Sequence, residues 1–293
     1  MLRKALILLV VALTVSLAVT QAQEPKNSTD TVFHHPGGTP QQEAQRQATQ
    51  QHIGQQSAWE RSVGSIGRDN IPDPLGDYAS VSAASLAAPK EAKAALRKAL
   101  RELEKGHSAK PAKSAQHLDK ARQHLEKAVA EYPEYATAWT KLGQLKADTG
   151  DPDGAIVALE KSVKLDERYL PPYDYLVWLY MAKEDWDHAT ELAKFVLDIN
   201  PLVAKMRWYL AGCAYESGRD DEALALFREI ENDAEAAKQF PQTHLFMGLI
   251  YTRHGQLAKA AADYRLYLLF VPNAPDAEAI KKQLNEWQQL GAN

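Results

Sequence analysis

Residues 136–169 read ATAWTKLGQLKADTGDPDGAIVALEKSVKLDERY, and this stretch decides how the rest of the chain is interpreted. Apolar residues recur at helical spacing on both sides of Gly150. Glycine tolerates a left-handed backbone, which commonly ends one helix shortly before the next begins. The stretch therefore predicts two helices joined by a short turn.

The same pattern returns along the chain at an interval of 34 residues. The alanines that mark it are Ala121, Ala155, Ala189 and Ala223, with Ala260 in a fifth unit that is shifted by three further residues. The turn positions that belong to four of these units are Gly150, Glu184, Gly218 and Gly255. One helix pair cannot bury its apolar face alone, so the repetition predicts a stack of pairs.

Two of the units carry more specific residues. Trp139, Leu142 and Gly143 stand in the order W-x-x-L-G ahead of Ala155, and the last unit has Gly248, Tyr251, Ala260 and Pro272 at corresponding places. This pattern resembles the tetratricopeptide repeat, and the resemblance covers about 92–272. It implies an all-α, right-handed superhelical solenoid. The residues that it assigns to packing within and between repeats are Trp139, Leu142, Gly143, Ala155, Ala189, Ala223, Gly248, Tyr251 and Ala260.

The repeats are expected at 89–135, 136–169, 170–203, 204–240 and 241–274, followed by an amphipathic capping helix over 275–290. The first repeat contains an insert at 107–116, which is either a loop or an extension of its second helix. The fourth repeat is followed by three additional residues. Pro89 fits the first position of the opening helix.

The N-terminal part of the chain has a different character. Residues 1–22 combine Arg3 and Lys4 with an apolar run and a small-x-small ending, which is typical of a secretory signal cleaved after Ala22. The protein is therefore expected to be exported, to the periplasm or the extracellular space. The alternative is an uncleaved segment that tethers an assembly factor to the membrane. Residues 23–88 are rich in glutamine, glycine and proline and poor in large aliphatics, which predicts a disordered tail.

Composition excludes several kinds of protein. A net charge of −4 and a pI near 6.2 argue against a nucleic-acid partner. The single cysteine, Cys213, rules out an intramolecular disulfide and is expected to be a small buried core residue. No phosphate-binding, zinc-protease or nucleophile-elbow motif is present, so the sequence predicts no enzyme, cofactor or metal site. The alternative from a different functional class is an enzyme or an enzyme subunit.

The resemblance also implies a partner-binding groove lined by the first helix of each repeat. The residues that we expect to form its apolar patch and basic flanks are Trp178, Met181, Lys205, Trp208, Tyr215, Leu245, Leu249 and Arg253. The lysines and asparagines that clamp chaperone tails in some family members are absent. An apolar peptide or partner helix suits this lining better. The predicted function is thus a non-catalytic scaffold or adaptor of the cell envelope with a protein or peptide partner, with self-association as a further alternative.

Overall fold

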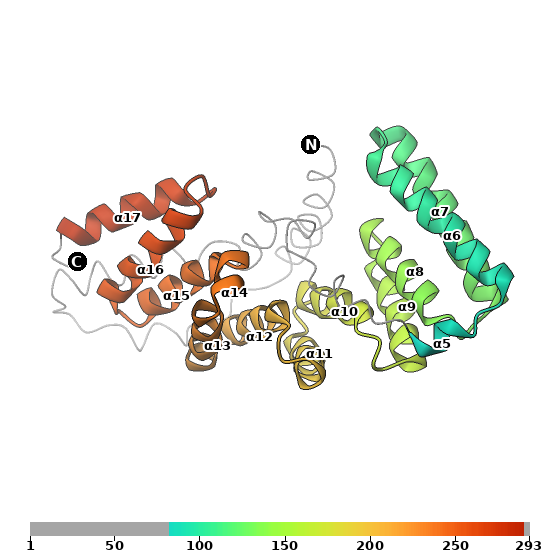
Figure 1. The fold of residues 1–293 in the computed structure, drawn as a ribbon. Helices are drawn as coiled ribbons and strands as arrows, with labels where there is room; N and C mark the ends of the chain where they lie inside the picture. The colour runs from blue at the N-terminus through green and yellow to red at the C-terminus, as the bar shows by residue number, and fades with distance from the viewer. Residues whose placement is uncertain (1–81, 290–293) are drawn as a thin grey trace, which may run out of the picture. The chain divides into compact units, whose positions relative to one another are not determined.

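The computed structural model describes residues 82–289, and every regular element in this range is an α-helix (Figure 1). A short helix, α5 (Ala83–Leu86), comes first and a long one, α17 (Ala277–Gln289), comes last. Between them lie α6 (Lys90–Ser108), α7 (Pro111–Glu131), α8 (Ala136–Asp148), α9 (Pro152–Leu165), α10 (Pro171–Ala182), α11 (Trp186–Ile199), α12 (Ala204–Glu216), α13 (Asp220–Asn232), α14 (Ala234–Gln239), α15 (Gln242–Arg253) and α16 (Leu257–Phe270). Within this range no helix is long and apolar enough to cross a bilayer.

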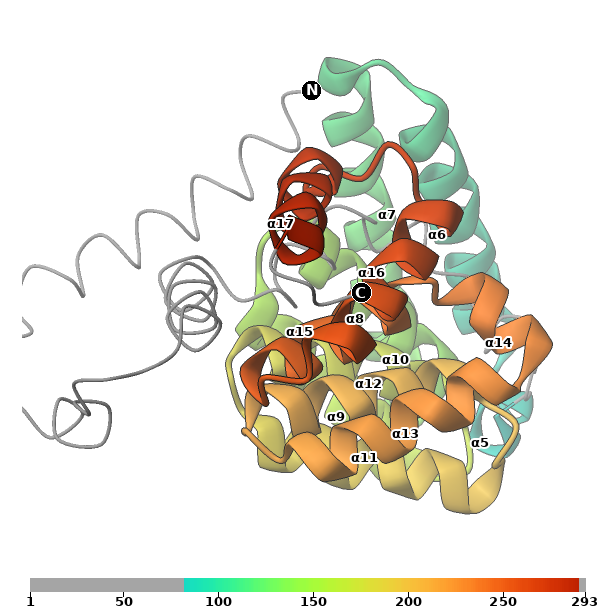
Figure 2. The same ribbon diagram turned by 90° about the vertical axis from the view of Figure 1, so that its left-hand side faces the viewer.

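The helices pack as consecutive pairs. The two helices of each pair contact one another in α6/α7, α8/α9, α10/α11, α12/α13 and α15/α16. Each pair contacts the next, because its second helix packs against the first helix of the following pair (Figures 1 and 2). This arrangement confirms the predicted all-α stack of helix–turn–helix repeats.

The turns inside four of the pairs have one geometry. Gly150, Gly218 and Gly255 take positive φ angles of 86°, 70° and 70°. In each turn the residue after the glycine donates its backbone N–H to a carbonyl five residues earlier, as Asp151 does to Lys146 at 2.9 Å. This bond is typical of a helix end that is closed by a left-handed residue. The sequence pattern placed these turns correctly.

Glu184 occupies the fourth of these turns with a φ of 58°, although it has a Cβ. A left-handed backbone is costly for such residues, so Glu184→Gly is expected to raise the free energy of unfolding by about 0.5–1 kcal/mol. The converse change, Gly150→Ala, should lower it by about 1 kcal/mol, because the added Cβ meets nothing within 4 Å and only the backbone strain remains. Urea denaturation of both variants checks this pair, and a less stable Glu184→Gly would contradict it.

Small residues allow the paired helices to approach closely. A Cβ at Gly143 would lie 2.5 Å from a Leu159 side-chain atom, and one at Gly248 would lie 2.4 Å from the Tyr264 ring. The periodic alanines are all fully buried: Ala121, Ala155, Ala189, Ala223 and Ala260. Leu142 and Tyr251 are buried as well, while Trp139 is half-buried and donates its indole N–H to the Pro133 carbonyl at 2.9 Å. The residues assigned to packing therefore lie in or against the core.

The N-terminal end of the repeat stack differs in detail from the expectation. The insert at 107–116 does not form a long loop, because α6 and α7 are extended to 19 and 21 residues and meet within it. The tail predicted for 23–88 ends earlier than expected. Ser82 donates its hydroxyl to Asp166 at 2.7 Å, and the Thr137 backbone N–H donates to the Ser85 hydroxyl at 3.0 Å. The predicted signal at 1–22 and the tail over 23–81 lie outside the described residues.

At the C-terminal end, α17 covers the last pair. Trp287 is buried, and its ring stacks on Tyr264 with 5.8 Å between centroids. Ile280 lies on the same buried face of this helix. The Tyr264 side of α16 is thereby removed from water, which is the role of a capping helix in repeat proteins.

Candidate functional site

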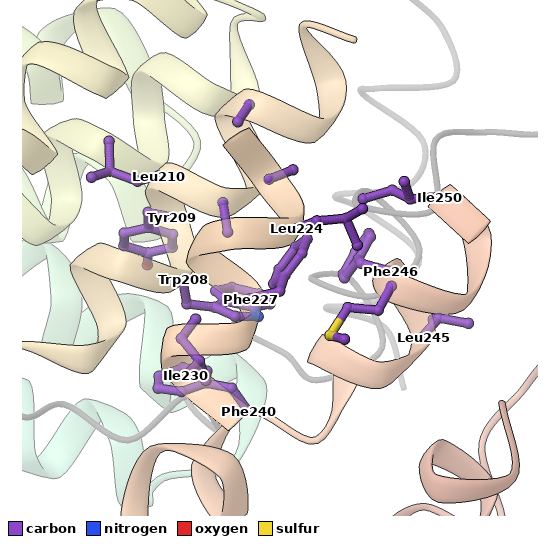
Figure 3. Close-up of a cluster of buried hydrophobic side chains, with 14 of the residues drawn as sticks. Trp208, Tyr209, Leu210, Leu224, Phe227, Ile230, Phe240, Leu245, Phe246 and Ile250 are labelled. Carbon is purple, nitrogen blue, oxygen red and sulfur yellow. The ribbon is translucent and has the colours of Figure 1, made fainter. Parts of the chain in front are cut away.

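Most of the residues that we expected to line an open groove are buried. Their exposed fractions are 0% for Trp208, 2% for Lys205, 4% for Met181, 6% for Leu245 and 8% for Leu249. Figure 3 shows Trp208 and Leu245 within a cluster of apolar side chains that includes Phe227 and Phe246. The prediction that these five residues contribute to an exposed patch is therefore wrong.

Trp208 is covered in part by the chain around the three additional residues of the fourth repeat. They belong to a segment that forms α14, in which Asp233 caps the helix by accepting the backbone N–H groups of Glu235 and Ala236. The chain then places Phe240 on Trp208, with 5.3 Å between ring centroids and 21° between ring planes. An aromatic ring thus covers the indole that we expected to face a partner.

Lys205 is buried for a different reason. Its Nζ lies 2.9 Å and 3.0 Å from the two carboxylate oxygens of Asp174, and both side chains are almost inaccessible. The ammonium also lies 5.8 Å from the centroid of the Tyr209 ring. Charged groups leave water only when they are paired in this way. This pair joins α10 to α12, so Lys205 stabilises the stack and does not flank a patch.

Three of the predicted lining residues still reach the surface. Trp178 and Tyr215 are half-buried, and the Arg253 side chain is 40% exposed. Tyr215 and Arg253 lie together, because the guanidinium carbon is 4.9 Å from the phenol ring centroid. Trp178 is positioned by α10 and packs against two clusters of the apolar core. These three residues form what we call the residual surface of the first helices.

Neighbouring groups hold the Tyr215–Arg253 pair in place. Asp220, at the start of α13, accepts a hydrogen bond from Arg253 Nη1 at 2.9 Å and lies 2.8 Å from Nε2 of His254. The Tyr215 ring packs edge-on against Phe246, with 5.2 Å between centroids. Burial is the main cause of a raised pKa for Tyr215, so its hydroxyl stays protonated at neutral pH. The arrangement offers an aromatic face and a cation, which suit binding rather than covalent chemistry.

Cys213 lies in the core, as the sequence predicts. The residue is fully buried, and desolvation raises the pKa of its thiol to about 11. A buried neutral thiol does not form disulfides readily. The folded chain is therefore not expected to form a disulfide-linked dimer through Cys213. Non-covalent self-association stays a prediction.

Family comparison agrees with the repeats seen in the structure. Two models of the tetratricopeptide repeat match the sequence, over residues 112–177 and 176–239. The chain is a tetratricopeptide repeat protein. Sequence comparison with curated proteins found no relative. Repeats of this kind support a protein-interaction scaffold in general, and proteins with this fold are typically non-catalytic.

Several solved structures share the fold of this tetratricopeptide repeat protein. MamA from Desulfovibrio magneticus RS-1 (residues 41 to the end) is 14% identical with a TM-score of 0.54, over 64% of this chain and 99% of that one. YrrB, described as a TPR protein with an unusual peptide-binding site, is 19% identical with a TM-score of 0.50, over 67% and 100%. PilW, described as a widely conserved type IV pilus biogenesis factor, is 15% identical with a TM-score of 0.51, over 70% and 94%. At these identities the comparisons show the fold alone.

One group of residues escaped the sequence analysis. Glu231, His244 and Asp263 each present a possible metal-ligand atom, and these atoms lie within 4.8 Å of one another. No short motif links them, because His244 and Asp263 are 19 residues apart and come from facing helices. The expectation that the tetratricopeptide repeat protein has no metal site stays a prediction.

Proposed function

We propose that this tetratricopeptide repeat protein is an exported, non-catalytic scaffold. It holds an apolar peptide or helix of another protein against the first helices of its repeats. The observation that carries the proposal is the half-buried Tyr215 ring beneath the partly exposed Arg253 guanidinium. Tryptophan, tyrosine and arginine dominate the energetic centres of protein interfaces. Trp178 supplies a second aromatic anchor on α10.

The rest of the surrounding surface favours an apolar partner over a strongly charged one. Asp220 offsets part of the positive charge of Arg253 and His254, since it contacts both. A partner side chain that packs against Tyr215 and Arg253 therefore needs no counter-charge of its own. The peptide-binding site named in the description of YrrB shows that this fold can hold a peptide elsewhere, and this supports the proposal by analogy.

Affinity capture with the mature chain tests the binding part of the proposal. Wild type, Trp178→Ala and Tyr215→Ala are immobilised, and proteins retained from a native envelope extract are identified by mass spectrometry. The matched control is Trp186→Ala, because Trp186 is also a half-buried tryptophan but begins α11, the second helix of the same pair. We expect wild type and Trp186→Ala to retain the same partner. The amount of that partner retained by Trp178→Ala and by Tyr215→Ala should be at least tenfold lower. Equal retention by all four chains would contradict the proposed surface.

Export is a separate part of the proposal and rests on the sequence of residues 1–22. Cleavage after Ala22 would leave a mature chain that begins at Gln23. N-terminal sequencing of the protein isolated from its source tests this directly. A chain that begins at Met1 would favour a membrane-tethered assembly factor instead.

A further inference from the structure

We propose that Glu231, His244 and Asp263 form a binding site for a first-row divalent cation, for which Zn²⁺ is the probe. They are the one group of three such ligands that residues 82–289 bring together. Their helices belong to two successive repeats, since Glu231 lies in the last turn of α13 while His244 and Asp263 come from α15 and α16. The inference does not depend on the proposed partner surface, because Trp178, Tyr215 and Arg253 take no part in it.

Two of the ligands are already in place. Nδ1 of His244 lies 3.0 Å from Oδ1 of Asp263, and both side chains are more than nine-tenths buried. Phe270 stacks on the imidazole with 5.9 Å between centroids and 10° between planes, which fixes the orientation of the ring. A separation of 3.0 Å also fits two ligands that share one metal, because metal–ligand bonds of about 2.0–2.2 Å place neighbouring ligand atoms about 3–3.5 Å apart.

The third ligand is free to complete the site. Glu231 is exposed, and within the described part of the chain no hydrogen bond or ion pair engages its carboxylate. Its ligand atom is within 4.8 Å of the other two, so rotation of one exposed side chain brings it into bonding range. Its position is at the rim of the buried pair, where a cation would enter from solvent.

The charge of the site matches a divalent cation. Two carboxylates and a neutral imidazole give a ligand set with a charge of −2. The nearby cation Arg228 offsets part of this charge: its pKa is raised mainly by its hydrogen bond to the Tyr251 hydroxyl at 2.7 Å and also by the negative charges of Glu231 and Asp263. Within residues 82–289 no ion pair joins Arg228 to either carboxylate. Imidazole nitrogen with carboxylate oxygen suits zinc and its neighbours in the first transition row.

Three protein ligands leave a zinc coordination position open. Such a position takes water, or a side chain supplied by another molecule. A cation here would also tie α13, α15 and α16 together, because each helix contributes one ligand. Binding of the cation is therefore expected to stabilise the junction between the fourth and fifth repeats, so it should be detectable both as a raised Tm and in a direct binding measurement.

The test compares Zn²⁺ binding to four metal-stripped, untagged full-length chains by isothermal titration calorimetry at pH 7.5. They are wild type, Glu231→Gln, Asp263→Asn and His188→Gln. His188 is the matched control, because it also pairs with an aspartate, Asp185, but in the described structure no third ligand atom joins that pair within 4.8 Å. Any weak sites elsewhere in the chain are common to all four and cancel in the comparison.

We expect wild type and His188→Gln to bind one equivalent of Zn²⁺ with the same affinity. Glu231→Gln should bind it at least tenfold more weakly, and Asp263→Asn should not bind it. Melting should show the same order, with Zn²⁺ raising the Tm of wild type and His188→Gln only. Glu231→Gln changes an exposed side chain and should stay folded, so it keeps the test decisive if Asp263→Asn does not fold. Equal binding by wild type and Glu231→Gln, or no binding by wild type, would overturn the inference.

Discussion

Lys205→Met is expected to destabilise the protein by about 3–5 kcal/mol, because it leaves the buried Asp174 carboxylate without its ammonium partner. Solvation cannot replace the lost interaction, since Asp174 is only 3% exposed. The loss should appear in urea denaturation as a lower midpoint with an unchanged slope, as expected when stability changes without a change in exposed surface.

The double variant Lys205→Met with Asp174→Leu separates the charge from the packing. Removing both charges leaves no buried carboxylate, so the double variant should recover much of the loss and can equal the wild type. A double variant as unstable as the sum of its two single variants would show that the pair is not coupled. A single variant with wild-type stability would contradict the burial of Lys205.

Trp208→Ala is expected to destabilise the protein by about 3–5 kcal/mol, which is the usual cost of deleting a large aromatic from a core. The indole is fully buried and stacks on Phe240, so its removal leaves a cavity between α12 and the segment after α14. Circular dichroism during thermal melting would show a large fall in Tm. This reverses the expectation from sequence alone, in which Trp208 faced a partner.

Trp178→Ala is the matched comparison for Trp208→Ala. Trp178 is half-buried, so its loss should cost clearly less stability than the loss of Trp208. If Trp208→Ala retained the wild-type Tm while losing a captured partner, the burial described above would be wrong. If both variants melted alike and far below the wild type, Trp178 would belong to the core.

The repeat pattern predicted the parts of the fold that depend on local sequence. Close helix pairs need small residues such as Gly143 and Gly248, and tight turns need left-handed residues such as Gly150. These requirements recur at a fixed interval, so the sequence alone predicts the hairpins and their order. Glu184 adopts the same turn without being glycine, which shows that position in the repeat overrides residue preference.

The accessible site was not predictable in the same way. Exposure of a lining residue depends on what the neighbouring segments cover, and here the segment after α13 places Phe240 over Trp208. Lys205 was read as a surface cation because its partner, Asp174, lies in the preceding repeat, 31 residues away. Both errors come from contacts between repeats, which a pattern within one repeat does not describe.

The most direct test of the account asks which face of the protein holds the partner. A photo-crosslinking residue is introduced at position 178 on α10 or, as a control, at position 157 on α9, where Val157 is 67% exposed. We expect irradiation in native extract to link the partner to position 178 and not to position 157. A partner linked through position 157 alone would contradict binding at the first helices.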